Sequence, residues 1–406
     1  MKVTSLSVEE FSDVYSGGTP STNNNVYWNG DIPWITPKDL AGYEARYIAF
    51  GERNISEEGL RNSSARLLPP DTVLLTTRAP IGYVALASVS LATNQGFKNL
   101  VCKTGVALPV FVYYMLKNST AILESHSSGA TFKELSSSRL KAIMFRLPSI
   151  KIQQKIADTL SAYDDLIENN CRRIKLLEES ARLLYQEWFV RLRFPGYEHV
   201  RIVDGVPEGW KKSTLAGACS SLEDGDWVES KDQGGDDYRL LQISNIGMNE
   251  FVETGNFRYV TEQTFKRIHC REILPGHILI SRMPKPIGRA WLAIEMPWKM
   301  ITAVDGAILV PNDEIADRYF ILYHLNSPEN IEHCERRAVG ATRPRISRRE
   351  LASLPILIPP ALLQRQFRDV VEPQNMQRNN LFRQNQKLRA ARDILLPKLM
   401  NGEIAV

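Results

Sequence analysis

Four arginines lie within seven residues in the stretch GATRPRISRR, at residues 340–349. A guanidinium group can donate two parallel hydrogen bonds to the edge of a guanine or to a phosphate. The stretch could therefore bind DNA, and the alternative is that it forms a solvated basic face. We predict that Arg343, Arg345 and Arg348 contact DNA.

Further side chains that could contact a base or a phosphate lie in and beside turn-rich loops in both halves of the chain. Asn and Gln can pair with adenine, and Lys more often holds a phosphate. In the first half, the predicted DNA contacts are Lys38, Arg78, Asn94, Gln95, Lys98 and Lys133. In the second half, they are Asn245, Arg282, Lys285 and Arg289, together with the arginine cluster.

The sequence lacks the motifs that carry catalysis. A methyltransferase acting alone would need a Gly-rich cofactor loop and an Asn/Asp-Pro-Pro-aromatic motif, and LLPPD and LIPPA have neither the leading residue nor the aromatic. There is no Walker loop, and no Glu-x-Lys follows Pro70-Asp71. His269-Cys270 and His333-Cys334 have no further ligands at metal spacing. We therefore predict no catalytic residue, metal site or cofactor in this chain.

The candidate residues fall in two similar halves of the chain. LPPDTVLLTTRAPIG at 68–82 matches LPGHILISRMPKPIG, which lies 206 residues further on at 274–288. The same offset places WITPKDL (34–40) on LLQISNI (240–246), and GAT at 129–131 recurs at 340–342. Chance combined with shared β-propensity is the alternative explanation. An ordered series of matches predicts an internal repeat.

The loops before the first strand of each copy differ, although the frame around them is shared. The first copy has SGGTPSTNNNVYW (16–28) and the second has LEDGDWVESKDQGGDDY (222–238). Such a pattern is typical of two copies that read different targets. Tyr27, Trp28 and Trp34 could contact bases, but aromatic residues more often pack in strands, and we expect Trp34 in the core.

A long helix is predicted to follow each copy. No Pro or Gly occurs from Lys151 to Arg193, and a stripe of seam residues there keeps the 3, 4 spacing of a coiled coil. The predicted seam is Leu160, Tyr163, Ile167, Asn170, Ile174, Leu177, Ala181, Leu184 and Trp188. Asn170 is a polar seam residue, which can fix the register at some cost in stability.

The second copy offers the partner for this helix. Its predicted seam is Phe367, Val370, Gln374, Gln377, Leu381, Gln384, Leu388, Ala391 and Leu395. Pro373 interrupts the first turns, and we expect a kink or a break there. The stretch between the helices, RFPGYEHVRIVDGVPEGW (193–210), is a linker that starts the second module.

These elements predict an α+β fold with two similar domains of mixed α/β structure. Two long helices would join the domains as an antiparallel coiled coil with pseudo-two-fold symmetry. We expect the domains at residues 1–148 and 195–358, the central helix at 149–194, and the C-terminal helix and tail at 359–406. Because the DNA backbone has two-fold pseudosymmetry, such a chain could grip DNA at two places, with the helices setting the gap.

Bulk properties agree with a soluble protein. The chain has 406 residues, 43% of them hydrophobic, with a net charge of +4 and a pI of about 8.7, which is compatible with a polyanion partner. The five cysteines form no Cys-x-x-Cys, there is no apolar leader, and no run of 18 apolar residues occurs. We therefore expect a cytoplasmic location and no membrane association.

Several short motifs occur in a fixed order along nearly the whole chain. They are SGGTPS (16–21), YWNGDIPWI (27–35), APIGYVA (79–85), TNQGFKNL (93–100), SGATFKELS (128–136), LPSIKIQQKIADTL (147–160), GATRPRIS (340–347) and LLPKLMNGEI (395–404). No single motif is specific, but their order and duplication are. With them, the chain resembles the specificity subunit of a type I restriction-modification system.

The resemblance implies a non-catalytic subunit of a restriction enzyme and adenine-specific methyltransferase complex. Two target recognition domains would each read one half of a bipartite site in double-stranded DNA, and two helical regions would set the spacer. The implied partners are methylase subunits, expected to be two, and restriction subunits that act as motor and nuclease. The partners would use S-adenosylmethionine, ATP and Mg²⁺.

Large apolar residues crowd the ends of both helices. They are Tyr185, Trp188 and Phe189 on the first helix and Leu396, Leu399 and Met400 on the second. One interpretation is that they bind a partner subunit, and the other is that they pack against their own domains. For the whole chain, the hypotheses other than DNA recognition are a fused enzyme, which the missing motifs oppose, and a coiled-coil scaffold or adaptor without DNA readout.

Overall fold

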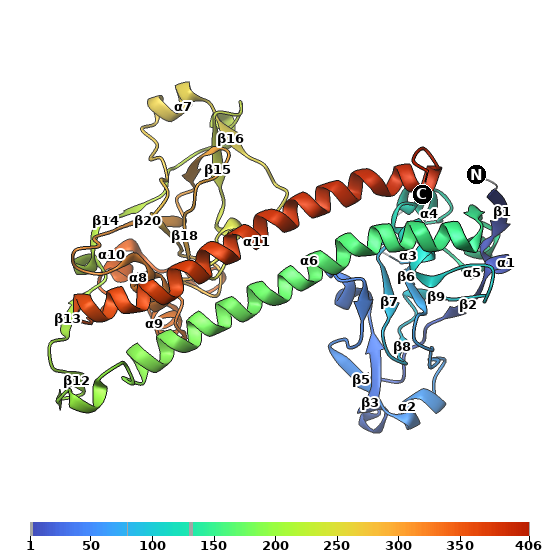
Figure 1. Cartoon of the computed structure of the whole chain (residues 1–406), viewed down its shortest axis with the longest axis horizontal. Coiled ribbons are helices and arrows are strands. Elements are labelled where there is room, and N and C mark those ends of the chain that lie inside the picture. The colour runs from blue at the N-terminus through green and yellow to red at the C-terminus, as the bar shows by residue number, and fades with distance from the viewer. Residues whose placement is uncertain (1–2, 79, 130–132, 406) are drawn as a thin grey trace. The chain divides into compact units, whose positions relative to one another are not determined.

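The computed structural model describes residues 3–78, 80–129 and 133–405, so that the motif residues 79 and 130–132 lie outside the described ranges. The chain forms two compact units (Figure 1). Unit 1 comprises residues 1–172 and 381–406, and unit 2 comprises residues 173–380.

Unit 1 is built on two main sheets and a two-stranded ribbon. The first sheet has the order β2 (Ser12–Ser16), β9 (Phe97–Cys102), β6 (Val73–Thr76), β7 (Val84–Ala87) and β4 (Tyr47–Ile48). The second has the order β5 (Arg53–Ile55), β3 (Trp28–Ile35) and β8 (Ala92–Thr93), and the ribbon pairs β1 (Val3–Ser7) with β10 (Met144–Pro148). The short helices are α1 (Val8–Phe11), α2 (Glu57–Arg61), α3 (Pro109–Lys117), α4 (Thr120–Ser125) and α5 (Ser137–Ala142).

Unit 2 has sheets of the same kind. Its first sheet has the order β14 (Cys219–Asp224), β20 (Gly306–Pro311), β17 (Ile278–Ser281) and β18 (Ala290–Leu292). The second has the order β16 (Tyr259–Val260), β15 (Tyr238–Leu241) and β19 (Lys299–Thr302), and the ribbons pair β13 (Lys211–Thr214) with β21 (Pro355–Ile358) and β11 (Ile202–Val203) with β12 (Val206–Pro207). The short helices are α7 (Glu262–Arg267), α8 (Arg318–Leu325), α9 (Pro328–Arg337) and α10 (Arg348–Ala352).

The strand orders confirm the internal repeat. β2-β9-β6-β7 in unit 1 corresponds to β14-β20-β17-β18 in unit 2, and β5-β3-β8 corresponds to β16-β15-β19. In both second sheets the middle strand pairs antiparallel on one side and parallel on the other. The matched apolar runs VLLT and ILIS form β6 and β17, and every residue of both strands is buried. Shared sequence therefore builds the core of each unit.

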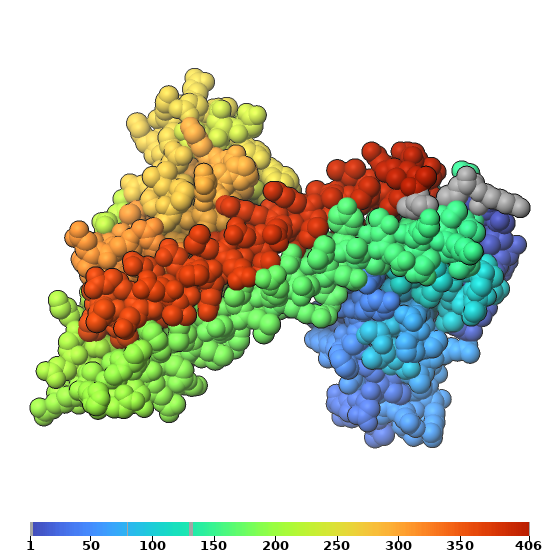
Figure 2. Space-filling model, viewed as in Figure 1, coloured from blue at the N-terminus to red at the C-terminus, as the bar shows by residue number. Residues whose placement is uncertain are grey.

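Two long helices join the units, as predicted. α6 spans Ile150–Tyr185 and continues into a π-helical turn at Gln186–Val190, and α11 spans Ala361–Asn401. The predicted seam of α6 is confirmed, since all nine positions are buried or half-buried. The outward faces of both helices are visible in the space-filling view (Figure 2).

Within each unit the two helices pair antiparallel. In unit 1, Asp164 contacts Arg392 and Asn170 contacts Asn385. In unit 2, Glu178 contacts Arg378. The Asn170 amide donates to the Asn385 amide oxygen at 3.0 Å in a buried position, which confirms Asn170 as a polar seam residue.

The predicted seam of α11 needs correction. Val370, Gln377 and Gln384 are exposed. Phe367 and Leu381 of the predicted seam are buried, and Gln374, Leu388, Ala391 and Leu395 are half-buried. The other buried positions of α11 are Leu363, Gln364, Val371, Asn375, Arg378, Asn385, Arg392, Leu396 and Leu399. A lone buried cation is costly. Arg378 and Arg392 can be buried because each has a carboxylate partner on α6, at 3.5 and 2.5 Å.

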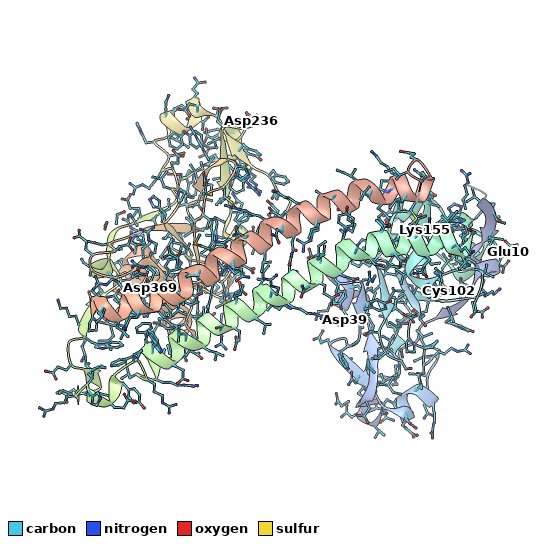
Figure 3. All side chains as sticks on the ribbon, viewed as in Figure 1. Glu10, Asp39, Cys102, Lys155, Asp236 and Asp369 are labelled. Carbon is cyan, nitrogen blue, oxygen red and sulfur yellow. The ribbon has the colours of Figure 1, made fainter. Side chains whose placement is uncertain are left out.

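Pro373 does not break α11, which is one helix from Ala361 to Asn401. A proline in a helix leaves the carbonyl four residues earlier without its backbone donor. Both Pro373 and Asp369, the residue that carries this carbonyl, are exposed, so that water can replace the donor. Figure 3 labels Asp369 on α11. Of the predicted kink or break, the break is therefore wrong, and the kink stays a prediction.

Candidate nucleic-acid interface

Ser16 and Asp224 occupy equivalent positions in the two units. Each is the last residue of the edge strand of its first sheet, in β2 and β14. Two residues further on, Gly18 N–H donates to Thr93 O at 2.8 Å in unit 1, and Asp226 N–H donates to Thr302 O at 2.8 Å in unit 2. The chain therefore leaves both edge strands along the same path.

A glycine follows each of these residues because another backbone segment passes very close. A Cβ added to Gly17 would lie 2.0 Å from Asn94 O, and one added to Gly225 would lie 2.3 Å from Ala303 O. Neither position has room for a side chain. The loops that start here, which differ in sequence between the copies, are therefore held to the same backbone frame.

A second segment is also equivalent in the two units. Leu135 N–H donates to Thr77 O at 2.9 Å, and Ile346 N–H donates to Arg282 O at 3.2 Å. The next residue in each unit, Ser136 or Ser347, caps a short helix through its side chain. Hence Ser137 and Arg348, the first residues of α5 and α10, occupy equivalent positions.

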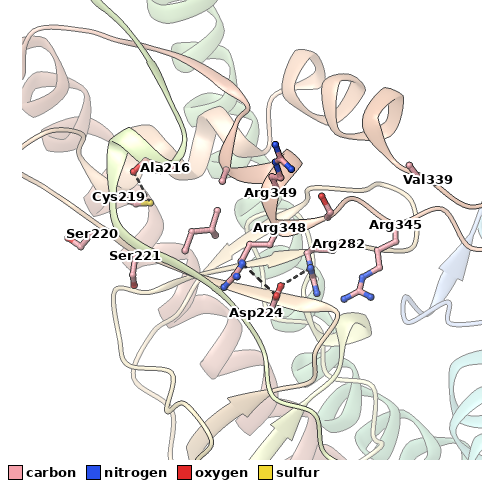
Figure 4. Close-up of a pocket in the computed structure, with 13 residues that line it drawn as sticks. Ala216, Cys219, Ser220, Ser221, Asp224, Arg282, Val339, Arg345, Arg348 and Arg349 are labelled. Atoms are coloured by element: carbon pink, nitrogen blue, oxygen red, sulfur yellow. Dashed lines mark hydrogen bonds and ion pairs between the residues drawn. The ribbon is translucent and has the colours of Figure 1, made fainter.

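In unit 2, the two segments bring Asp224, Arg282 and Arg348 together (Figure 4). Asp224 lies 2.7 Å from Nη1 of Arg282 and 3.6 Å from Nε of Arg348. The Arg282 side chain is only 3% exposed, and its Nη2 also donates to Val304 O. One carboxylate is therefore shared by a buried and an exposed arginine.

These residues line a pocket of about 760 Å³. Its other polar lining residues are Ser220, Ser221, Ser347, Arg345 and Arg349. Arg345 also pairs with Asp305 at 3.1 Å. Burial lowers the pKa of Arg282, and the neighbouring Arg345 and Arg348 lower it further against the opposing effect of Asp224 and Asp305. An arginine nevertheless stays charged at neutral pH, so the pocket carries excess positive charge.

The equivalent site in unit 1 has different side chains. Ser16 lies 3.3 Å from Ser137 between their hydroxyl oxygens, and Lys98 Nζ donates to Ser16 Oγ at 3.1 Å. Arg78 pairs with Glu134 at 2.9 Å. Burial lowers the pKa of Lys98, although Glu134 opposes this effect. Unit 1 thus offers hydroxyls and a small cluster of paired charges where unit 2 offers arginines.

Among the predicted DNA contacts, Asn245 and Arg289 lie inside unit 2. Asn245 accepts from Gln242 N–H and donates to Val252 O, both at 2.9 Å, and caps a turn as Asp39 does in unit 1. Arg289 is 8% exposed and donates to four backbone oxygens. The geometry gives both a structural role, and their contact with DNA stays an untested prediction.

The remaining predicted contacts lie at or near the surface. Lys38 pairs with Glu52 and Lys285 with Glu335, at 2.7 and 2.9 Å. Gln95 is exposed and accepts from Thr19, and Asn94 accepts from Gly96 N–H at 2.9 Å. Lys133 and Arg343 are exposed. Of the predicted residues, Arg282, Arg345 and Arg348 line one pocket. Lys98 lies beside Ser16, and the charge of Arg78 lowers the pKa of Lys98.

The residues predicted to bind a partner pack in the cores of their own units. Tyr185 and Phe189 are buried in the core of unit 2, with Trp188 packed against it. Leu396 and Leu399 are buried in the core of unit 1, with Met400 packed against it. Packing against their own domains was the alternative interpretation, and the geometry favours it because little of these side chains is left for another protein.

Trp34 is buried, as expected, and donates its Nε1–H to Gly18 O at 2.9 Å. Sequence reasoning missed Asp224, which lines the pocket, and the hydroxyl pair in unit 1, whereas Arg349 belongs to the arginine cluster that it singled out. A position-by-position comparison of the two copies could have found them, since Ser16 with Ser137 and Asp224 with Arg348 are the places where a shared frame carries different chemistry.

Two further findings bear on the site. No group of three or more His, Cys, Asp or Glu residues in the described part of the chain is arranged to hold a metal ion. Across the same residues, no helix combines the length and the apolar character needed to cross a membrane.

The sequence of this chain is similar to those of known specificity subunits. Residues 2–179 match the family described as "Type I restriction modification DNA specificity domain". The chain is 34% identical over 407 residues to the type I restriction enzyme MjaIX specificity subunit of Methanocaldococcus jannaschii, covering 98% of this chain and 93% of that one. It is 30% identical over 164 residues to the EcoR124I/EcoR124II specificity subunit of Escherichia coli, covering 39% of this chain and 40% of that one.

A solved structure shares the fold. The S subunit of a type I restriction-modification system from M. genitalium superposes with a TM-score of 0.62 at 18% identity, covering 98% of this chain and 96% of that one.

Proposed function

Because the chain belongs to the type I restriction-modification DNA specificity family, we propose that it reads an asymmetric, bipartite DNA site. Each unit would read one half of the site. The chain would direct methylase and restriction subunits to that site, and it would carry no catalytic residues of its own.

One observation carries the proposal: two units share a backbone frame but place different side chains at the same point of it. The frame is defined by the equivalent bonds at Gly18 and Asp226, and by those at Leu135 and Ile346. Ser16 with Ser137 in one unit corresponds to Asp224 with Arg348 in the other. A reading module keeps its scaffold and varies the groups that face its target.

The long helices support a split site. α6 and α11 each contribute to both units, and they pair through a seam with buried polar contacts. A continuous helix has a fixed rise of about 1.5 Å per residue. We infer that the helices set the number of base pairs between the two half-sites.

The proposed partners are double-stranded DNA, two methylase subunits and restriction subunits with motor and nuclease activity. S-adenosylmethionine, ATP and Mg²⁺ would be bound by those partners. Methylation of an adenine would need the base to be turned out of the duplex by the partner complex. The five cysteines are all free thiols, in keeping with the reducing cytoplasm that we propose as its location.

The test is selection of binding sites by the full chain together with its cognate methylase subunits. A pool of random-sequence duplexes would be incubated with the complex, and the bound fraction sequenced. We expect two short blocks of defined sequence that differ from each other and are separated by a gap of constant length. No enrichment would favour a scaffold or adaptor without DNA readout, and a single block would contradict the split site.

A further inference from the structure

The pocket of unit 2 and the equivalent site of unit 1 share a backbone path but carry different charged side chains. Four arginines and one carboxylate line the pocket of unit 2: Arg282, Arg345, Arg348 and Arg349, with Asp224. In unit 1, the positions of Asp224 and Arg348 are held by Ser16 and Ser137. The cluster of four arginines therefore belongs to the second copy, whereas unit 1 has Lys98 and the Arg78–Glu134 pair.

The four arginines of the pocket carry more charge than their carboxylate partners neutralise. Arg282 and Arg348 share Asp224, and Arg345 pairs with Asp305. Arg349 is exposed and has no ion-pair partner among the residues that the structure describes. Like charges that line one pocket repel one another, which is tolerable in a binding site if a ligand supplies the missing negative charge.

We propose that this pocket of unit 2 binds one phosphate group of the DNA backbone, and that unit 1 has no counterpart. The proposal rests on the function proposed above and refines it. Arg348 and Arg349, which are exposed on α10, would donate to the phosphate oxygens, and the hydroxyl groups of Ser221 and Ser347 line the same pocket.

Arg282 has a different role. Its guanidinium is buried and held by Asp224 and Val304 O, so it cannot swing out to a ligand without losing both partners. It acts as a positioning residue, because it fixes Asp224, which in turn pairs with Arg348 (Figure 4).

The lining favours a phosphate over adenine or a stacked base, while an arginine by itself can bind either guanine or a phosphate. A site that reads adenine uses amide side chains, and a site that stacks a base uses aromatic rings. Neither occurs among the described residues that line the pocket, where the other side chains are small or aliphatic. With a volume of about 760 Å³ the pocket has room for a phosphate and the adjoining sugar.

The consequence is a division of labour between the units. Contacts with phosphate give affinity that is independent of sequence and falls with salt, whereas contacts with bases give specificity. Unit 2 would hold the duplex through this contact, and unit 1 would depend more on the sequence of its half-site.

The experiment compares two matched double variants of the full chain in complex with its methylase subunits. One is Arg348→Ala with Arg349→Ala in unit 2, and the control is Ser137→Ala with Ser138→Ala at the equivalent positions of unit 1. Affinity is measured for a selected target duplex and for a random-sequence duplex of equal length, between 50 and 200 mM salt.

We expect the arginine variant to bind both duplexes about tenfold more weakly at 0.1 M salt, with the slope of log affinity against log salt reduced by about one. The serine variant should keep the wild-type slope. Arg348→Lys with Arg349→Lys should restore the slope, since lysine also holds a phosphate, whereas guanine readout would not survive the change.

An unchanged slope in the arginine variant would overturn the proposal. So would a loss confined to the target duplex with altered base preference in one half-site, because that result means base readout. The proposed function fails separately, if the wild-type complex selects no bipartite target. In that case the random-duplex measurement still decides whether the pocket binds phosphate.

Discussion

Gln153 and Gln364 make the same three hydrogen bonds in the two units. The Gln153 amide accepts from Leu108 N–H at 2.9 Å and donates to Val106 O and Pro148 O at 3.0 and 2.9 Å. Gln364 accepts from Asp317 N–H at 2.7 Å and donates to Ile315 O and Pro359 O. Each glutamine therefore fastens the first turn of a long helix to the loop before α3 or α8 of its own unit.

The first prediction concerns these glutamines. Gln153→Ala should lower the free energy of unfolding by about 2–4 kcal/mol, because one buried and two partly buried backbone groups lose their partner. Gln154→Ala is the matched control, since Gln154 is exposed and its side chain donates to Asp158 in its own helix. Denaturant titration of both variants measures the difference, and equal midpoints would contradict the fastening role.

The second prediction separates structure from recognition among the arginines. Arg289→Ala should destabilise the protein by about 3 kcal/mol, because four backbone carbonyls lose a charged donor. Arg343→Ala changes an exposed side chain and should leave stability within about 0.5 kcal/mol. Thermal unfolding without DNA distinguishes the two. If Arg289→Ala leaves stability unchanged and weakens DNA binding, the structural role is wrong and Arg289 contacts DNA.

The third prediction is a pH dependence. Burial raises the pKa of Glu178 to about 7, although Arg378 opposes the shift and Glu250 adds to it. Since the folded pKa lies above the unfolded one, the folded state binds more protons, and stability should fall as the pH rises from about 4.5 to about 7. Glu178→Gln removes the titrating group and should flatten this part of the profile.

The control for this prediction is Glu179→Gln. Glu179 is exposed and pairs with Arg182, and this hydrogen bond lowers its pKa. Its replacement should leave the decline between pH 4.5 and 7 in place. Melting temperatures measured across the pH range for both variants test the assignment, which fails if the two profiles coincide.

The fourth prediction tests the helices as a spacer. Deleting residues 171–177 from α6 and 378–384 from α11 removes seven residues from each helix and keeps the buried pair of Asn170 and Asn385. The pair of helices should shorten by about 10 Å, which corresponds to about three base pairs of duplex. Site selection should show both half-sites unchanged with a different gap. If the half-sites change and the gap keeps its original length, the helices do not set the spacing.

The sequence predicted the repeat and the seam of α6 because both depend on local patterns. β6 and β17 are matched apolar runs, and the nine seam positions of α6 keep a regular spacing. The seam of α11 could not be predicted in the same way. Arg378 and Arg392 are buried there only because Glu178 and Asp164 meet them from a helix 200 or more residues away in sequence.

The site was predicted in part, for a related reason. A dense run of arginines is visible in the sequence, and Arg345 and Arg348 do line the pocket with Arg282. The role of Asp224 depends on the pairing of β14 and α10 in space, which no spacing along the chain reveals. Asn245 and Arg289 have side chains suited to DNA, but their surroundings supply backbone partners that occupy them.

The core of unit 1 contains Leu396 and Leu399 beside residues such as Leu160. During synthesis, the ribosome makes more than two hundred residues between the two sets, at about 5–20 residues per second. For about ten seconds or more, the apolar residues of unit 1 that pack against the last turn of α11 therefore remain exposed to solvent. Nascent unit 1 should consequently depend on chaperones for longer than unit 2, although its own sequence emerges first.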